Sequence, residues 1–509
     1  MLALTPPIHA RPLPRGRAAW IGLLLTLALA AGLFTRLNID DRLSRDEAVW
    51  VYGAQQWLDG VPYYKSIFDA KTPLAPALAS VGVEAARIVG GSDVYGARIL
   101  FLLFACAAAA AVYELGLALW GSVLAALAGA VAFLAFQGFA LDAIGGPDAK
   151  TPGIAFAVFS MLLLVRRRWL GGGALGALAF LCWQPLGIYM PVAVLAALAM
   201  SDRGRRRAAA VRAALGALVP VAATFAYFAL AHALPQFVDA AFRFPLEGLQ
   251  RTTQTVGQRA GLISDVVDMH YYALHGWLFW GGLLALAVAF AVALVRPAGR
   301  GRLRDPLLWV VAPTLIPLGL FSLHDFEAYP DVFPLLPYAA LGTGALASVV
   351  MRVRRVRAGA AAVLVATAVL AGFMWHRYAI TGHSAVPLSA QQVRADTIER
   401  LLGPSGRLYA IGDPTALVLT HRRNPDRYIY LGSGVMEWKL KHSHGGLSGW
   451  LASIRAFDPG VIVLHTFEPT ERGPQTFLRK LSQGYDSRWL GAWQILVKPA
   501  LLRQTPEAQ

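Results

Sequence analysis

Long apolar runs alternate with short clusters of arginine along most of this chain, and this alternation restricts the fold more than any other feature. Runs such as residues 18–34, 213–234 and 273–295 approach or exceed the roughly 20 residues with which an α-helix crosses a bilayer. Hydrophobic residues make up 56% of the 509 residues, and the mean hydropathy is +0.51, values above those of ordinary soluble domains. The sequence therefore predicts a polytopic α-helical membrane protein.

The arginine clusters predict which helix ends share one side of the membrane. They lie between apolar runs, at residues 166–168, 203–212, 296–304 and 352–357. Basic loops stay in the cytoplasm, so these clusters mark the inner side. The net charge of +16 is thus spread over loops, whereas nucleic-acid binding requires it on one soluble face. We therefore expect the lipid bilayer as a partner and no nucleic acid.

Counting the apolar runs gives about 11 to 13 spans, with the N-terminus inside. Residues 18–34 are long enough to remain as an anchor and continue into a polar stretch without a typical cleavage site. Residues 171–200, broken at Trp183-Gln184-Pro185, are predicted to form a short hairpin with both ends inside. Residues 74–90 contain Glu84 and Arg87, so either a span or a surface helix is compatible with them.

The composition changes after Arg377. Short apolar runs at residues 408–411, 428–431, 461–465 and 493–497 alternate with helix-like stretches at residues 390–402, 447–456 and 474–481. Such alternation indicates a small α/β domain with a partly parallel sheet. We therefore expect a membrane domain over residues 1–377 and an extracytoplasmic α/β domain over residues 378–509.

The most unusual polar segment is the predicted first external loop, at about residues 37–73. It contains Asp46-Glu47, then Tyr52, Gly60-Val61-Pro62-Tyr63 and Asp69-Ala70-Lys71-Thr72-Pro73. Ionisable groups beside apolar spans are usually paired, solvated or used in function. A solvated loop is the alternative interpretation, but the whole constellation favours a functional site.

This pattern resembles the first external loop of class C glycosyltransferases, in particular the bacterial protein O-mannosyltransferase and lipid A aminoarabinose transferase superfamily. The resemblance implies a multi-pass enzyme of the inner (cytoplasmic) membrane that moves a sugar from a polyprenyl phosphate to an acceptor on the outer face. It extends more weakly to about residue 375. Relatives often have an acidic or amide residue before the lysine, where some contact a metal, and this chain has Ala70.

The resemblance also implies roles for individual residues. Asp46 matches the leading acid of the motif and is the candidate base that deprotonates the acceptor hydroxyl; Glu47 is second, or holds the loop through a cation such as Arg45. Lys71 matches the lysine near the donor phosphate. A point-charge ammonium suits a phosphate oxygen, although an interfacial lysine that reaches toward water is the alternative.

Further candidates are weaker and each has a structural alternative. Arg243, Arg251 and Arg259 are candidate phosphate ligands in a predicted external loop at about residues 235–272, Asp148 supports donor or acceptor, and Tyr63 and Tyr329 match aromatic positions of the family pattern. A divalent metal is possible, but His270, His324 and Glu327 match no strong ligand spacing, and no cofactor is certain.

The favoured function is therefore an inverting membrane glycosyltransferase of the cell envelope, which uses a polyprenyl-phosphate-linked hexose or pentose. Its acceptor is a glycan, a lipid or a protein. The alternative is a polytopic transporter or lipid flippase, which should show internal repeats with paired broken helices. A third class, a sensor with an external binding domain, leaves the pattern between Asp46 and Pro73 unexplained.

Overall fold

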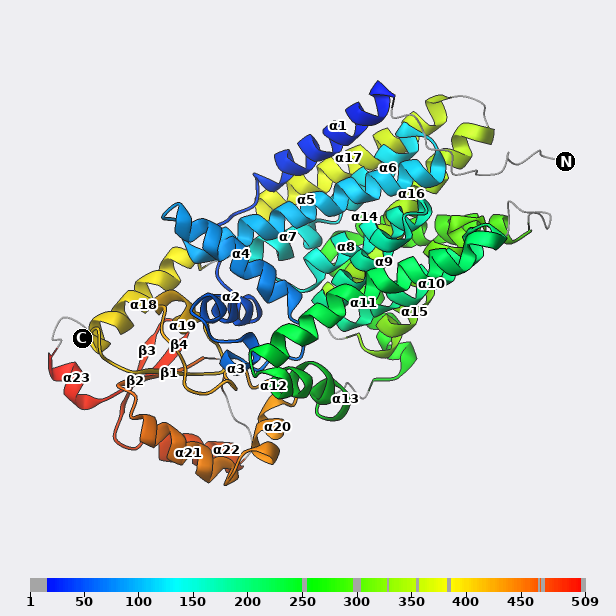
Figure 1. Cartoon of the computed structure of the whole chain (residues 1–509). Helices are drawn as coiled ribbons and strands as arrows, with labels where there is room; N and C mark the ends of the chain where they lie inside the picture. Colours follow the sequence, from blue (N-terminus) through cyan, green and yellow to red (C-terminus); the bar gives the residue numbers. More distant parts are fainter. Residues whose placement is uncertain are drawn as a thin grey trace.

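A bundle of long helices carries a small α/β region at one end (Figure 1). This computed structural model describes residues 16–249, 254–295, 304–326, 329–353, 357–381, 386–465, 467 and 472–504. Segments α2, α3, α12 and α13 lie between the bundle and the α/β region. The predicted combination of a helical membrane protein with a C-terminal α/β region is confirmed.

Seven helices in the described residues are long and apolar enough to cross a membrane, and an eighth span is formed if a bent helix pair counts as one. The single helices are α1 (Arg17–Phe34), α5 (Asp93–Trp120), α11 (Arg206–Leu230), α14 (Val256–Val295), η5 and α15 (Leu307–Val311, Ala312–His324), η6 and α16 (Tyr329–Leu335, Leu336–Val353) and α17 (Arg357–Thr381). The pair α6 (Val123–Ala135) and α7 (Gln137–Gly145) is bent by 55°.

Three shorter apolar helices complete the bundle: α8 (Lys150–Val165), α9 (Trp169–Cys182), and the continuous pair η1 and α10 (Gln184–Ile188, Tyr189–Met200). Helices α9 and α10 pack together around the break at Trp183, so the predicted hairpin over residues 171–200 forms, while the position of both its ends inside stays a prediction. The lower limit of the prediction, 11 spans, is reached only if the bent pair and all three short helices cross the membrane in addition to the seven long helices.

Glycines let some helices approach backbone to backbone, as is common where lipid supplies no hydrophobic driving force. A methyl group on Gly173 of α9 would lie 2.0 Å from the carbonyl oxygen of Ala213 in α11. A methyl group on Gly342 of α16 would lie 1.8 Å from the carbonyl oxygen of Gly282 in α14. Larger side chains at these positions would push the helices apart.

The described arginine clusters gather at the end of the bundle away from the α/β region. Arg166, which ends α8, pairs with Glu114 near the end of α5, and Arg304 pairs with Asp202 at 2.7 Å. Since α8 rises about 1.5 Å per residue, its ends lie more than about 20 Å apart. This arrangement agrees with the predicted common side for the basic loops, while the identity of that side stays a prediction.

Two predicted loops contain helices. Residues 37–73 hold α2 (Arg45–Leu58) and α3 (Tyr63–Ser66). The prediction of one long loop over residues 235–272 is wrong, because α12 (Leu234–Val238), η3 (Asp239–Arg243) and α13 (Phe244–Glu247) occupy its first part and α14 begins at Val256. Residues 74–90 form α4 (Leu74–Ile88), which packs on α5 and α2 and is not among the candidate spans.

The α/β region has a four-stranded sheet in the order β1-β2-β4-β3. Its strands are β1 (Leu408–Ile411), β2 (Val461–Leu464), β3 (Asp486–Leu490) and β4 (Trp493–Val497); its helices are α18 (Leu388–Leu402), α19 (Thr415–Thr420), α20 (Val435–His442), α21 (Gly446–Phe457), α22 (Arg472–Leu481) and α23 (Pro499–Gln504). Strands β1 and β2 are parallel, as predicted, and the other pairs are antiparallel.

One predicted strand, residues 428–431, is wrong. Its backbone makes isolated bonds in place of a ladder: the Ile429 carbonyl oxygen accepts from the amide of Gly412. The adjacent Arg427 carbonyl oxygen accepts from the amide of Phe68, in the segment at residues 37–73. The predicted domain boundary at residue 377 stays a prediction, since α17 continues to Thr381.

Candidate active site

The two neighbouring acids at the start of α2 have different surroundings. Asp46 keeps 66% of its side chain exposed, and its carboxylate lies 3.4 Å from the Arg45 guanidinium. Glu47 is partly buried and closes a capping box: its carboxylate accepts from the amide of Ser44 at 2.8 Å, while the Ser44 hydroxyl accepts from the amide of Glu47. Burial raises the pKa of the Glu47 carboxyl. Glu47 thus stabilises the start of α2, whereas the Asp46 carboxylate remains accessible to a substrate.

Arg98 of α5 fastens the approach to these acids. Its guanidinium is fully buried and donates to the carbonyl oxygens of Ile39, Asp41 and Arg42 at 2.6–3.1 Å, and to that of Gly145 at 2.9 Å. Gly145 and Gly146 lie directly against the Glu47 side chain, where an added methyl group would come within 2.8 Å. Helix α5 therefore fixes the segment at residues 37–73 against the turn that follows α7.

Asp69 organises the second half of the motif. Its buried carboxylate accepts from the indole nitrogen of Trp50 at 2.9 Å, the Tyr63 hydroxyl at 2.8 Å and the Lys71 amide at 3.2 Å. Three donors satisfy most of the acceptor capacity of a carboxylate. The predicted residue Tyr63 therefore acts on this site through Asp69. Its own ring is fully buried.

Lys71 presents a cation that no acid neutralises among the described residues. Its ammonium lies 4.9 Å from the centre of the Trp50 ring, a cation–π distance. The nearby backbone is held in place: the Lys71 carbonyl oxygen accepts from the Tyr64 hydroxyl at 2.6 Å, and that of Ala70 accepts from Gln184 at 2.7 Å. A fixed backbone with an available ammonium suits a phosphate ligand.

Trp50 connects the lysine to the exposed acid. Asp46 and Trp50 are four residues apart in α2, so their side chains project from the same helix face. Lys71 lies over that indole ring. The arrangement brings a solvent-exposed carboxylate and an ammonium to one side of α2, which the sequence pattern predicted only by resemblance.

A segment of the α/β region, residues 424–430, packs on the motif. The Asn424 amide donates to the Tyr52 hydroxyl at 2.9 Å, and the rings of Phe68 and Tyr428 stack at 4.8 Å. The Arg45 guanidinium lies 4.4 Å from the centre of the Tyr430 ring. Residues of the α/β region thus contact Arg45, Tyr52 and Phe68, which lie close in sequence to Asp46 and Lys71. No local sequence signal marks them, because each joins residues more than 350 positions apart.

Asp148 belongs to a second cluster of charged side chains. It is buried and accepts from the Lys150 amide at 2.6 Å, while the Lys150 ammonium pairs with Asp331 at 3.1 Å and lies 5.3 Å from the Trp183 ring centre. The cluster comes directly after Gly145 and Gly146, which contact Glu47, so Asp148 lies near the motif. Its carboxylate is occupied by contacts within the protein.

Of the remaining candidates, some already have partners within the protein, and others lie outside the residues that the structure describes. Arg243 is held by Asp239 at 3.9 Å and Glu247 at 3.6 Å, so two acids already compete for its charge. Arg259 is buried and donates to the Leu323 carbonyl oxygen. Arg251 and Glu327 lie outside the described residues, as do the side chains of His270 and Tyr329; His324 ends α15. In the described part of the chain no three His, Cys, Asp or Glu residues form a possible metal cluster.

Solved structures share this arrangement of helices. ArnT from Cupriavidus metallidurans bound to undecaprenyl phosphate superposes with a TM-score of 0.63 and 16% identity, over 96% of this chain and 99% of ArnT. Its apo structure gives 0.64 and 17%, over 95% and 99%. No protein-family model matches the chain, and no curated protein matches it in sequence. At this identity the similarity shows the fold: this chain has the fold of ArnT, a class C glycosyltransferase, as the motif predicted.

Proposed function

We propose that this protein is an inverting glycosyltransferase that moves a sugar from a polyprenyl phosphate to an acceptor hydroxyl outside the cytoplasmic membrane. The observation that carries the proposal is the arrangement of Asp46 and Lys71 on one side of α2, joined by Trp50. The fold shared with a protein bound to undecaprenyl phosphate supports the same class of donor.

Each group has a separate task in this reaction. The Asp46 carboxylate accepts the proton of the acceptor hydroxyl as the hydroxyl oxygen attacks the anomeric carbon. The bond between that carbon and the carrier phosphate oxygen breaks, and the electron pair stays on the phosphate. The Lys71 ammonium stabilises the negative charge that develops there. Attack opposite the leaving phosphate inverts the anomeric configuration.

Replacing one exposed acid tests the proposal. Asp46→Asn in the full chain, reconstituted in nanodiscs, should lower transfer from a polyprenyl-phosphate sugar by about 100- to 10,000-fold while donor binding persists, because the amide cannot accept the proton. Asp59→Asn is the matched control: Asp59 caps the other end of α2, is similarly exposed, and lies 3.6 Å from Arg87. Near-wild-type turnover of Asp46→Asn would remove Asp46 from the reaction.

A further inference from the structure

The break between α9 and η1 lies against the segment that carries Lys71. Helix α9 ends at Cys182, Trp183 has extended dihedral angles (φ −152°, ψ 125°), and η1 begins at Gln184. A helix end leaves its last four carbonyl groups without partners inside the helix. The carbonyls at the end of α9 and the side chains of the break are therefore able to bond a neighbouring segment.

Thr72 uses one of these carbonyls. Its hydroxyl donates to the carbonyl oxygen of Phe180, in the last turn of α9, at 2.8 Å. Thr72 is fully buried, so a hydroxyl without this acceptor would carry the cost of an unsatisfied polar group. The bond therefore fixes the residue that directly follows Lys71 to the end of α9.

Gln184 fastens the other side of Lys71. Its side-chain amide nitrogen donates to the carbonyl oxygen of Ala70 at 2.7 Å and to that of Ala241 at 2.9 Å. These two bonds use both of its N–H groups. Ala241 belongs to the π-helix η3, a form of helix that is rare and frequent at functional sites. One side chain thus joins the bundle, η3 and the residue before Lys71.

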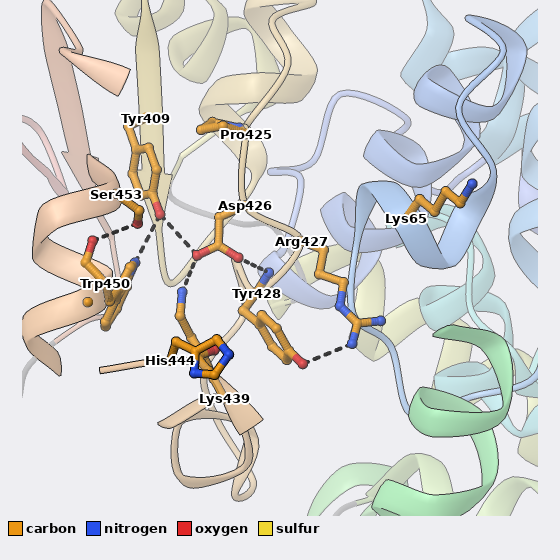
Figure 2. Close-up of a pocket in the computed structure, with 12 residues that line it drawn as sticks. Lys65, Tyr409, Pro425, Asp426, Arg427, Tyr428, Lys439, His444, Trp450 and Ser453 are labelled. Carbon is orange, nitrogen blue, oxygen red and sulfur yellow. Dashed lines mark hydrogen bonds and ion pairs between the residues drawn. The ribbon is translucent and has the colours of Figure 1, made fainter. Parts of the chain in front are cut away.

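Helix η3 is itself held by the α/β region. Asp239, its first residue, accepts from the Arg427 guanidinium at 2.9 Å. Arg427 also donates to the Tyr428 hydroxyl at 2.9 Å, as Figure 2 shows, and the Tyr428 ring stacks on Phe68. With the two bonds of Gln184, these contacts join η3 and the α/β region to residues 68–70.

The bonds hold the backbone around Lys71 and leave its ammonium available. The ammonium lies 4.9 Å from the centre of the Trp50 ring and has no acid partner in the described residues. A lysine side chain loses rotamer freedom when it binds a ligand, and this loss weakens the affinity. Fixing the backbone at residues 70 and 72 limits the positions that the ammonium reaches, so less freedom is lost on binding.

We propose that Gln184 and Thr72 are positioning residues for the donor phosphate. They hold the backbone on both sides of Lys71 so that its ammonium meets the phosphate of the polyprenyl carrier. The inference rests on the proposed function for the role of Lys71. It adds the residues through which the break between α9 and η1 acts on that site.

A pair of threonine variants tests the bond to α9. Thr72→Val keeps the shape and removes the hydroxyl, so in the full chain in nanodiscs it should weaken binding of polyprenyl phosphate about fivefold. Thr72→Ser keeps the hydroxyl and should bind nearly as wild type. Thr26→Val is the matched control, because Thr26 is a buried threonine whose hydroxyl donates to Gly22 within its own helix α1. Wild-type affinity of Thr72→Val would remove Thr72 from this role.

A double-mutant cycle separates positioning from a general loss of structure. Gln184→Met removes both donors without adding charge and should weaken donor binding about tenfold. In a Lys71→Met background the same change should cause no further loss, because the group that Gln184 positions is gone. An equal loss in both backgrounds would overturn the proposal, as would wild-type affinity of Gln184→Met.

The position of Lys71 can also be followed without the donor. The chain has seven lysines, and reductive methylation with isotope-labelled formaldehyde gives each an NMR signal. The signal of Lys71 is the one lost in Lys71→Met, and the ring of Trp50 shifts it. Thr72→Val and Gln184→Met should move this signal toward that of a free lysine, whereas Thr72→Ser should not. An unmoved signal in both variants would contradict positioning.

These outcomes are separate from those of the proposed function. If Lys71→Met bound polyprenyl phosphate as tightly as wild type, the proposed donor site would fail, whatever the other variants showed. If Lys71→Met lost affinity while Thr72→Val and Gln184→Met bound normally, the proposed function would stand and the positioning role would fail.

Discussion

Two lysines lie over tryptophan rings beside an aspartate, one in the segment at residues 37–73 and one in the α/β region. They differ in which groups donate hydrogen bonds to the aspartate. Asp69 accepts from Trp50, Tyr63 and the Lys71 amide, so the Lys71 ammonium has no acid partner in the described residues. Asp426 accepts instead from the Lys439 ammonium itself, along with two other donors.

The difference decides what each cation can do. At Lys71, neutral donors occupy the carboxylate and the charge remains for an incoming anion. At Lys439, which is 3% exposed, the charge is used inside the protein, and burial lowers the pKa of its ammonium despite the Asp426 carboxylate. Similar residue types thus give a candidate ligand site in one place and a structural pair in the other.

The largest expected effect is on stability at Lys439. Lys439→Met leaves the Asp426 carboxylate in a buried network without its cation, and breaking such a pair costs about 3–5 kcal/mol. Thermal unfolding of the full chain should show a clear loss, which adding Asp426→Asn largely restores. Lys71→Met should unfold like wild type. A stable Lys439→Met would erase the distinction between the two lysines.

The next effect is on donor binding at Lys71. Lys71→Met should weaken binding of polyprenyl phosphate by about 10- to 150-fold, since a charge-assisted contact contributes about 1.5–3 kcal/mol. The double variant Asp426→Asn with Lys439→Met should bind the donor normally. Direct titration of lipid into nanodisc-embedded protein measures both. Unchanged affinity in Lys71→Met would mean that the donor phosphate lies elsewhere.

A smaller effect concerns the carboxylate between Trp50 and Lys71. Trp50→Phe removes the indole donor to Asp69 and exposes that carboxylate to the Lys71 ammonium. Losing one hydrogen bond costs about 1 kcal/mol, so donor affinity should fall about fivefold. Trp57→Phe, on the same helix, serves as the comparison, because it removes an indole donor to the Tyr227 hydroxyl and none to Asp69. Equal affinities for the two variants would show that Asp69 does not control the charge of Lys71.

The smallest effect is a pH dependence at Glu47. Its folded pKa is raised, so the folded state binds more protons than the unfolded state and stability falls as pH rises from about 4.5 through the folded pKa. Glu47→Gln keeps a capping-box partner and should remove this loss. Melting temperatures between pH 4 and pH 8 test it against Glu84→Gln, an exposed acid on α4. Parallel curves for wild type and Glu47→Gln would contradict the prediction.

The sequence predicted the elements that local pattern determines. Strands β1, β2 and β4, helices α18, α21 and α22, and the break at Trp183 were all predicted within a few residues. It also predicted which segment carries the candidate site, because charge beside apolar spans is rare. Strand β3 was missed, since Asp486–Leu490 has a mostly exposed, polar edge and little hydrophobic pattern.

The surroundings of the site could not be predicted, because distant residues form them. Residues 428–431 have the composition of a strand, yet the Ile429 carbonyl oxygen accepts from the Gly412 amide, and that of the preceding Arg427 accepts from the Phe68 amide. The division of tasks between Asp46 and Glu47 depends on Gly145 packing against one of them. Such differences follow from how remote segments pack against each other, which the local sequence pattern does not encode.

The contacts of the α/β region on residues 37–73 also set an order of events during synthesis. The Leu43 amide bonds to Gln391 and the Tyr52 hydroxyl to Asn424, partners that lie 348 and 372 residues further along the chain. At about 5–20 residues per second, a ribosome needs roughly 20–70 seconds to cover that distance. The segment that contains Asp46 and Lys71 is thus synthesised early, but it can form its contacts with the α/β region only after that region has been synthesised. A nascent chain that stops before residue 424 already has both residues but lacks the partners that shape them.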